Sequence, residues 1–191
     1  MIGACYTEAM HEEVIATNQW QLVGKSKNGV SVVYDPVNSN AATHFEDTPQ
    51  LKELVTEALK NIELTGQKVA EAVDMGRVVG TSDVVDVDSS DEIVYGVRKN
   101  RDGDGLVPFT KTRQGKPCSL VAIHLVPQAN SSYVLSSAWI GPFNDDDEPF
   151  PQSANATEGS IDFWDKHAFV YGSQEIVNGS ETTIRPWGTE A

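Results

Sequence analysis

The sequence predicts an α+β protein in which N-terminal helices pack on an antiparallel β-sheet of about four to five strands. Two observations lead to this prediction. A strong amphipathic helix pattern lies in the first third of the chain, and four strand-like runs follow it, at 77–87, 92–99, 119–127 and 132–141. Only a short turn separates the last two runs, so we expect them to pair antiparallel.

Length and composition limit the class of protein. A chain of 191 residues with 39% hydrophobic residues fits one domain with a real core, or one domain with an elaborated end. No run of about 18 apolar residues occurs, so no membrane span is expected. The start of the chain lacks the basic and apolar regions of a signal peptide, and we therefore expect a cytoplasmic protein.

Residues 1–42 are expected to form an N-terminal cap made of a short helix and a hairpin. Residues 6–17 have weak helical spacing. Residues 19–34 read as two strands joined by the Ser-Lys-Asn-Gly turn at 26–29, because the second strand is rich in β-branched residues. The turn-rich segment 35–42 then leads into an α+β core domain at 43–191.

The clearest helix begins near residue 49. Thr48 can cap it, and Pro49 suits the first helical position. Its apolar residues recur with a helical period and form one stripe: Leu51, Leu54, Val55, Ala58, Leu59 and Ile62. We expect Gly66 to end the helix and a shorter helix to follow at 67–75.

The second half of the core alternates strands with turns. After the four strand-like runs, residues 142–160 form an acidic, Pro-rich loop. Ser160 is expected to cap a short amphipathic helical turn, and residues 168–172 return to strand.

The stretch 95–116 concentrates positive charge in an acidic protein. It holds six of the 14 Lys and Arg residues of a chain whose net charge is −14. The six are Arg98, Lys99, Arg101, Lys111, Arg113 and Lys116. Clustered cations favour an anion-binding site, and Arg and Lys together with the Thr110 hydroxyl suit a phosphodiester. The alternative is a solvated basic loop that pairs with the acidic residues 145–148.

Residues 100–105 (NRDGDG) come close to a calcium-binding loop. The loop needs a bidentate acid at its twelfth position, and Lys111 stands there. An Asp-Gly turn is therefore the better interpretation. We expect no metal and no other cofactor.

Two of the four histidines are candidate acid/base groups. His44 lies just before the helix at 49, and His167 follows the aromatic residues Phe163 and Trp164. For each of them taken singly, a packing role is favoured over a catalytic one. Beside clustered cations, a histidine can take the 2′-hydroxyl proton of RNA or protonate the leaving 5′-oxygen, while Arg and Lys stabilise the charge on the phosphate.

The order of these segments resembles a known superfamily. His44-Phe45 leads into the helix, followed by MGRVVGTSDVV at 75–85, VYGVRKNR at 94–101, PFTKTR at 108–113 and a strand pair ending in SSAWIG at 136–141. This is similar to the metal-independent ribonuclease fold shared by barnase, EndoU, colicin-type tRNases and RelE, notably its toxin and phage-associated branches. The resemblance covers about residues 43–172.

The resemblance implies an endoribonuclease-like domain of bacterial or phage origin. It implies His44 as the catalytic histidine, with Arg98, Arg101 and Lys111 on the following strands. It also implies an assisting hydroxyl, for which Thr110 and Ser137 match. Arg113, Ser137, Trp139 and His167 would then contact the substrate, and RNA or another phosphate-containing ligand is the expected partner, alongside a protein inhibitor or partner.

Two other functions remain open. A non-enzymatic acidic interaction protein, such as an immunity-like or phage accessory module, predicts scattered histidines and cations dispersed into salt bridges. A small-molecule phosphate or nucleotide-binding protein predicts the same basic loop, with Trp139 or Trp164 stacking on a base.

Overall fold

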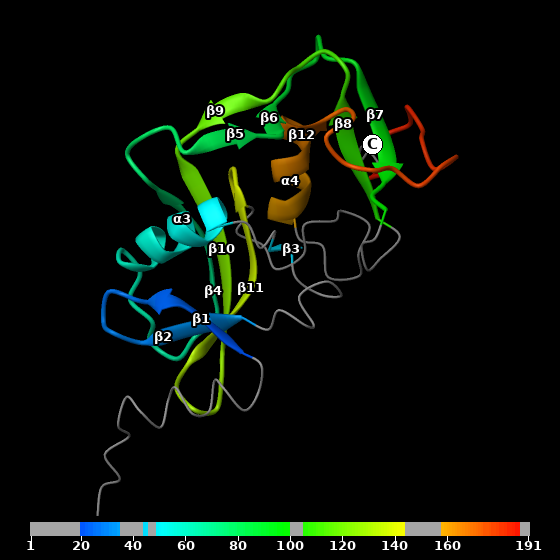
Figure 1. The fold of residues 1–191 in the computed structure, drawn as a ribbon. Helices are drawn as coiled ribbons and strands as arrows, with labels where there is room; N and C mark the ends of the chain where they lie inside the picture. Colours follow the sequence, from blue (N-terminus) through cyan, green and yellow to red (C-terminus); the bar gives the residue numbers. More distant parts are fainter. Residues whose placement is uncertain (1–19, 35–43, 46–48, 100–104, 144–157, 188–191) are drawn as a thin grey trace, which may run out of the picture. The chain divides into compact units, whose positions relative to one another are not determined.

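The computed structural model describes residues 20–34, 44–45, 49–99, 105–143 and 158–187 (Figure 1). These residues are mostly β and contain two helices and three sheets. The expected arrangement, with N-terminal helices packed on one antiparallel sheet of four to five strands, is therefore wrong. The helix predicted at 6–17 lies outside the described residues.

The chain divides into two compact units, and each unit is made of two separate segments of the sequence. The first unit combines residues 1–75 with 121–139, and the second combines residues 76–120 with 140–191. The boundaries at 120/121 and 139/140 fall at the ends of the last predicted strand pair, which belongs to the first unit except for its end residues.

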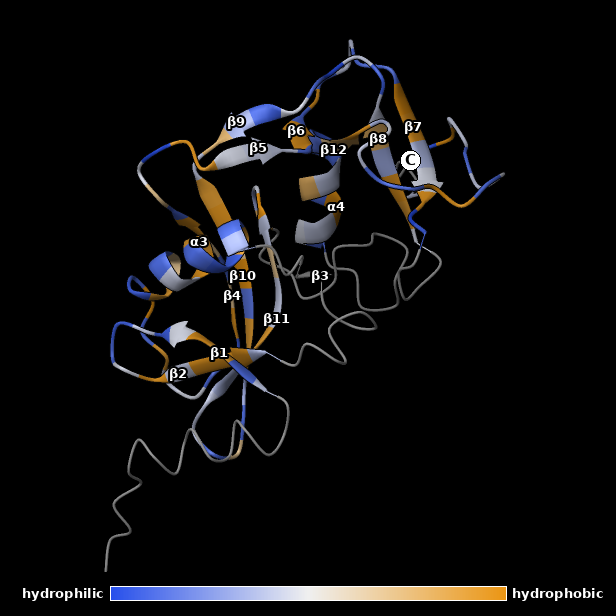
Figure 2. Ribbon diagram, viewed as in Figure 1, coloured by the Kyte–Doolittle hydropathy of each residue, from blue (hydrophilic) through white to orange (hydrophobic). Residues whose placement is uncertain are grey.

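The first unit is built on a six-stranded sheet of order β1-β2-β11-β10-β4, in which β3 also pairs with β11. Its strands are β1 (Gln21–Lys25), β2 (Ser31–Tyr34), β3 (His44–Phe45), β4 (Val69–Asp74), β10 (Leu120–Pro127) and β11 (Tyr133–Ile140). Both β2 and β3 run parallel to β11, so the sheet is mixed rather than antiparallel. Figure 2 shows apolar stretches along β10, which lies inside this sheet.

The two hairpins of this sheet confirm the local predictions. β1 and β2 pair antiparallel, and the turn between them is closed by the Ser26 amide, which donates to Val30 O at 2.9 Å. Gly29 has φ of 81°, a backbone conformation that glycine adopts without cost. β10 and β11 are joined by a turn in which the Gln128 amide donates to Ser132 O at 2.9 Å.

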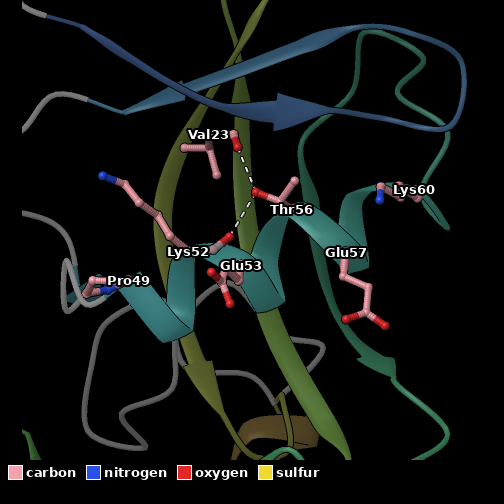
Figure 3. Close-up of a pocket in the computed structure, with 7 residues that line it drawn as sticks. All are labelled: Val23, Pro49, Lys52, Glu53, Thr56, Glu57 and Lys60. Atoms are coloured by element: carbon pink, nitrogen blue, oxygen red, sulfur yellow. Dashed lines mark hydrogen bonds between the residues drawn. The ribbon is translucent and has the colours of Figure 1, made fainter.

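Helix α3 (Pro49–Leu59) confirms the amphipathic prediction, but it ends at Leu59 and not at Gly66 as expected. All five apolar positions within it are buried, and Ile62 just beyond it is buried too. A bulge in β1 falls between Leu22 and Gly24. At this bulge the Thr56 hydroxyl donates to Val23 O at 2.7 Å (Figure 3). The helix is thereby fixed to β1 by both apolar packing and a hydrogen bond.

The short helix predicted at 67–75 is wrong, because this segment forms strand β4 beside β10. Val69, Ala70 and Val73 match helical spacing, but the open edge of β10 supplies backbone partners that an isolated short helix lacks. Gly66, with φ of 91°, starts the turn into this strand, and its amide donates to the Tyr133 hydroxyl at 2.7 Å.

The second unit contains a four-stranded sheet of order β6-β12-β8-β7 and a two-stranded sheet β5-β9. Its elements are β5 (Gly80–Ser82), β6 (Val84–Asp86), β7 (Ile93–Val97), β8 (Leu106–Thr110), β9 (Lys116–Cys118), α4 (Glu158–Lys166) and β12 (His167–Val170). β12 runs antiparallel to β6 but parallel to β8.

The run 77–87, predicted as one strand, is split between two sheets. The break lies at Asp83, where the fully buried Ser82 hydroxyl donates to Val84 O and accepts from the Val84 amide. A serine hydroxyl that forms hydrogen bonds with both backbone groups of a nearby residue stabilises a sharp change of strand direction.

Helix α4 begins at Glu158, three residues before the predicted start at Ile161. Ser160 is not its cap but a fully buried residue within it. Trp164 on this helix joins a core cluster with Val84, Val107, Phe109, Phe169 and Trp187.

The C-terminal segment lies along the outer edge of β7. The Tyr95 and Thr182 backbones exchange two hydrogen bonds, of 2.8 and 2.9 Å, and the Val177 amide donates to Val97 O. This pairing satisfies backbone groups that an edge strand leaves open.

Candidate functional site

The described lysines of the basic stretch 95–116 form ion pairs with acids of the same unit. Lys99 lies 2.9 Å from Glu175, Lys111 lies 3.5 Å from Glu92, and Lys116 contacts Asp86. Arg101 and the turn residues 100–104 lie outside the described residues, as do the acidic residues 145–148.

Arg113 is held by ion pairs with two aspartates. Its guanidinium lies 2.7 Å from Asp91 Oδ1 and 2.9 Å from Asp88 Oδ2, and the Thr112 hydroxyl donates to the same Asp91 oxygen at 2.6 Å. These contacts hold the pKa of the Asp91 carboxyl well below its usual range, with the Arg113 hydrogen bond as the main cause. Arg113 is therefore occupied in joining two loops.

Arg98 is also engaged within its own unit. It donates to Gln174 Oε1 at 2.7 Å, and its guanidinium carbon lies 4.5 Å from the centre of the Phe169 ring. Gln174 in turn donates to Asp83 Oδ2 at 2.6 Å. Arg98 thus links the end of β7 to the C-terminal segment.

Thr110 and Lys111 have different environments although they are neighbours. Thr110 is fully buried, and its hydroxyl lies 3.1 Å from that of Thr112. The Lys111 side chain is 40% exposed and lies over the Tyr171 ring at 5.1 Å. Of these two predicted site residues, Lys111 is the one that a ligand in solution can reach.

The first unit brings two predicted site residues together. His44 of β3 and Ser137 of β11 are Cα partners in a parallel pair, although they are far apart in the sequence. Neighbouring strands lie about 4.8 Å apart, so these two positions are adjacent in the sheet. Trp139 lies two residues further along β11 and therefore on the same sheet face as Ser137.

His167 lies in the second unit and is a Cα partner of Asp86 across β12 and β6. Its Nδ1 lies 2.9 Å from Phe163 O, and its Nε2 lies 3.3 Å from Asp86 Oδ1. The imidazole stacks on the Phe163 ring at 4.2 Å. The side chain is 21% exposed, so it reaches solvent from a fixed position.

A surface pocket lies beside helix α3 (Figure 3). Charged side chains of both signs line it, among them Lys52, Glu53, Glu57 and Lys60. None of the predicted site residues whose side chains the structure describes lines it. Lys52 also donates to the Tyr34 hydroxyl at 2.7 Å, which ties the helix to β2.

Comparisons with protein-family models, curated proteins and solved structures found no match to this chain. Within the part of the chain that the structure describes, no group of three or more His, Cys, Asp or Glu residues is placed to hold a metal ion. No helix among the described residues is long and apolar enough to cross a membrane.

Asp86 is a residue of interest that the sequence patterns did not single out. It sits at the end of a strand-like run, and nothing in its local pattern distinguishes it from the neighbouring acids. Only strand pairing places it between Lys116 and His167. The pKa of its carboxyl is lowered, chiefly by the Lys116 hydrogen bond.

Proposed function

We propose that this protein is a metal-independent RNA-cleaving domain in which His44 and Ser137 belong to the catalytic site. The observation that carries the proposal is the register of β3 on β11, which makes these two positions direct neighbours. The family resemblance implies a catalytic histidine near the helix and an assisting hydroxyl on the later sheet. A register shift of one residue would have separated them onto opposite faces.

In the proposed reaction the His44 imidazole accepts the proton of a ribose 2′-hydroxyl. The 2′-oxygen attacks the phosphorus, the bond to the 5′-oxygen breaks, and that oxygen takes a proton from a second acid or from water. The products are a 2′,3′-cyclic phosphate and a free 5′-hydroxyl. Ser137 is expected to donate a hydrogen bond to a phosphate oxygen, where charge develops.

The cations of the second unit, taken by themselves, differ in how firmly they are held by other side chains. Lys111 and Glu92 are 40% and 63% exposed, and such a pair contributes at most about 1 kcal/mol. A phosphate can therefore displace Glu92. Arg98 and Arg113 have several partners each, and we assign them a role in stability.

The test is cleavage of total RNA by the wild type and by single variants. His44→Ala should reduce the rate by about 10²- to 10⁴-fold, the usual contribution of a general base. Ser137→Ala should reduce it more modestly. Ser136→Ala is the matched control, because its side chain points to the opposite sheet face. Equal background cleavage by all four proteins would contradict the proposal.

A second function is favoured by a separate observation. The described lysines of the basic stretch and Arg113 are paired with acids, as expected for a non-enzymatic acidic interaction protein. That function predicts no RNA cleavage and a basic protein partner whose binding weakens with added salt.

A further inference from the structure

Three ionisable side chains from three different strands converge in the second unit. Asp86 ends β6, Lys116 begins β9 and His167 begins β12. The Asp86 carboxylate contacts both of the other side chains, with Oδ2 on the Lys116 ammonium and Oδ1 at 3.3 Å from His167 Nε2. The sharp change of strand direction at Ser82–Val84 makes this convergence possible, because it places β6 in a different sheet from the β5-β9 pair.

The His167 ring is fixed in a way that selects which nitrogen faces outward. Its Nδ1 lies 2.9 Å from Phe163 O, and a carbonyl oxygen only accepts hydrogen bonds, so Nδ1 carries a proton. Stacking on Phe163 at 4.2 Å, with 14° between the ring planes, fixes the plane of the ring. Nε2 is therefore the nitrogen presented to Asp86 and, beyond it, to solvent.

Asp86 is the loosely held member of the cluster. Its side chain is 71% exposed, against 45% for Lys116 and 21% for His167. The contact of its Oδ1 with Nε2, at 3.3 Å, is longer than a good charge-assisted hydrogen bond, which is about 2.7–2.9 Å. An exposed ion pair of this kind is weak enough for a competing anion to replace it.

We propose that Lys116 and His167 form a binding site for the phosphate group of a phosphodiester, and that Asp86 occupies the anion position in the free protein. The Lys116 ammonium and the protonated form of His167, the imidazolium, whose Nε2 then also carries a proton, are the two donors that the phosphate oxygens need. Phosphate binding displaces Asp86, whose exposure leaves it room to move. The inference rests on the proposed function for RNA as the source of the phosphodiester.

The experiment follows the His167 ring signals by NMR during titration with two probes. One probe is inorganic phosphate, and the other is a 2′-deoxy dinucleotide, which has the phosphodiester but cannot be cleaved through a 2′-hydroxyl. Both probes should shift the His167 signals saturably. Lys116→Gln should weaken binding, whereas Asp86→Asn should strengthen it by roughly two- to fivefold, the factor that an exposed charge contact is worth. Lys99→Gln, which removes the pair with Glu175, should change nothing.

Each outcome has one meaning for the inference. Absence of a saturable His167 shift with either probe, in a wild type that unfolds cooperatively, overturns it. Weaker binding by Asp86→Asn overturns the assigned role of Asp86. Binding of inorganic phosphate without the dinucleotide shows a free-phosphate site and overturns the phosphodiester assignment.

The same samples separate this inference from the proposed function. If the probes bind and the wild type does not cleave RNA, the phosphate site stands and the nuclease proposal fails. If His44→Ala abolishes cleavage while neither probe shifts His167, the nuclease proposal stands and the phosphate site is overturned.

Discussion

The Trp187 indole nitrogen donates a 2.8 Å hydrogen bond to Asp165 Oδ1 on helix α4. Asp165 also receives the Arg185 guanidinium, at 2.6 Å from its other oxygen. The indole meets the Tyr95 ring edge-on, with 5.4 Å between ring centroids. A residue near the end of the chain thus joins α4 to β7 and completes the core of the second unit.

Trp187→Ala should destabilise the protein by about 3–5 kcal/mol, because it empties a buried aromatic position and leaves a carboxylate short of a partner. Urea denaturation measures the loss. Ile184→Ala, in the same segment at 76% exposure, is the control and should change stability little. A small effect of Trp187→Ala would show that the segment is not part of the folded core.

The Asp91 carboxyl should make stability depend on pH. Its pKa is lowered in the folded protein, mainly by Arg113. A lowered carboxyl pKa adds stability above the unfolded value, about 3.9, and that stability is lost as the pH falls below it. The difference in melting temperature between wild type and Asp91→Asn should therefore be large at pH 6 and smaller at pH 3. A difference that does not change with pH would contradict this account.

Gly96→Ala should destabilise the pairing of β7 with the C-terminal segment. A Cβ atom at Gly96 would lie 2.7 Å from Ile176 Cγ2, too close for a real contact. We expect a loss of about 1–3 kcal/mol, as for other overpacked sites. Ile176→Ala should relieve the clash, so the double variant should lose less than the sum of the two single variants. Strict additivity in denaturant unfolding would show that Ile176 does not cause the strain.

Thr56→Val tests the hydrogen bond that fixes α3 to the bulge in β1. Valine keeps the shape of threonine but leaves Val23 O without its 2.7 Å donor, and the expected loss of stability is about 1 kcal/mol. Lys60→Gln, on an exposed residue just beyond the helix, serves as the control in the same thermal unfolding series. Equal melting temperatures for Thr56→Val and wild type would mean that water replaces the hydroxyl.

Local chemistry explains the correct sequence predictions. The β1–β2 turn depends on Ser26 and Gly29, which lie within the turn itself. The helix at 49–59 depends on an apolar stripe that repeats within one segment. Information of this kind is contained in neighbouring residues, so a sequence reading can use it.

The wrong predictions share a different cause. Residues 69–74 have a pattern that fits a helix, yet they form β4 because β10 offers a sheet edge. Ser160 has the chemistry of a cap, yet the helix begins before it and buries it. In both cases distant partners outweighed local preference.

The sequence alone determined the hairpin, the amphipathic helix, the last strand pair and the concentration of cations at 95–116, because each depends on residues close together in the chain. Only the tertiary structure decided that the chain divides into two units, that His44 stands beside Ser137, and that Asp86 meets Lys116 and His167. Those relationships depend on strand register, which is set by pairing between segments distant in sequence. No local pattern encodes that pairing.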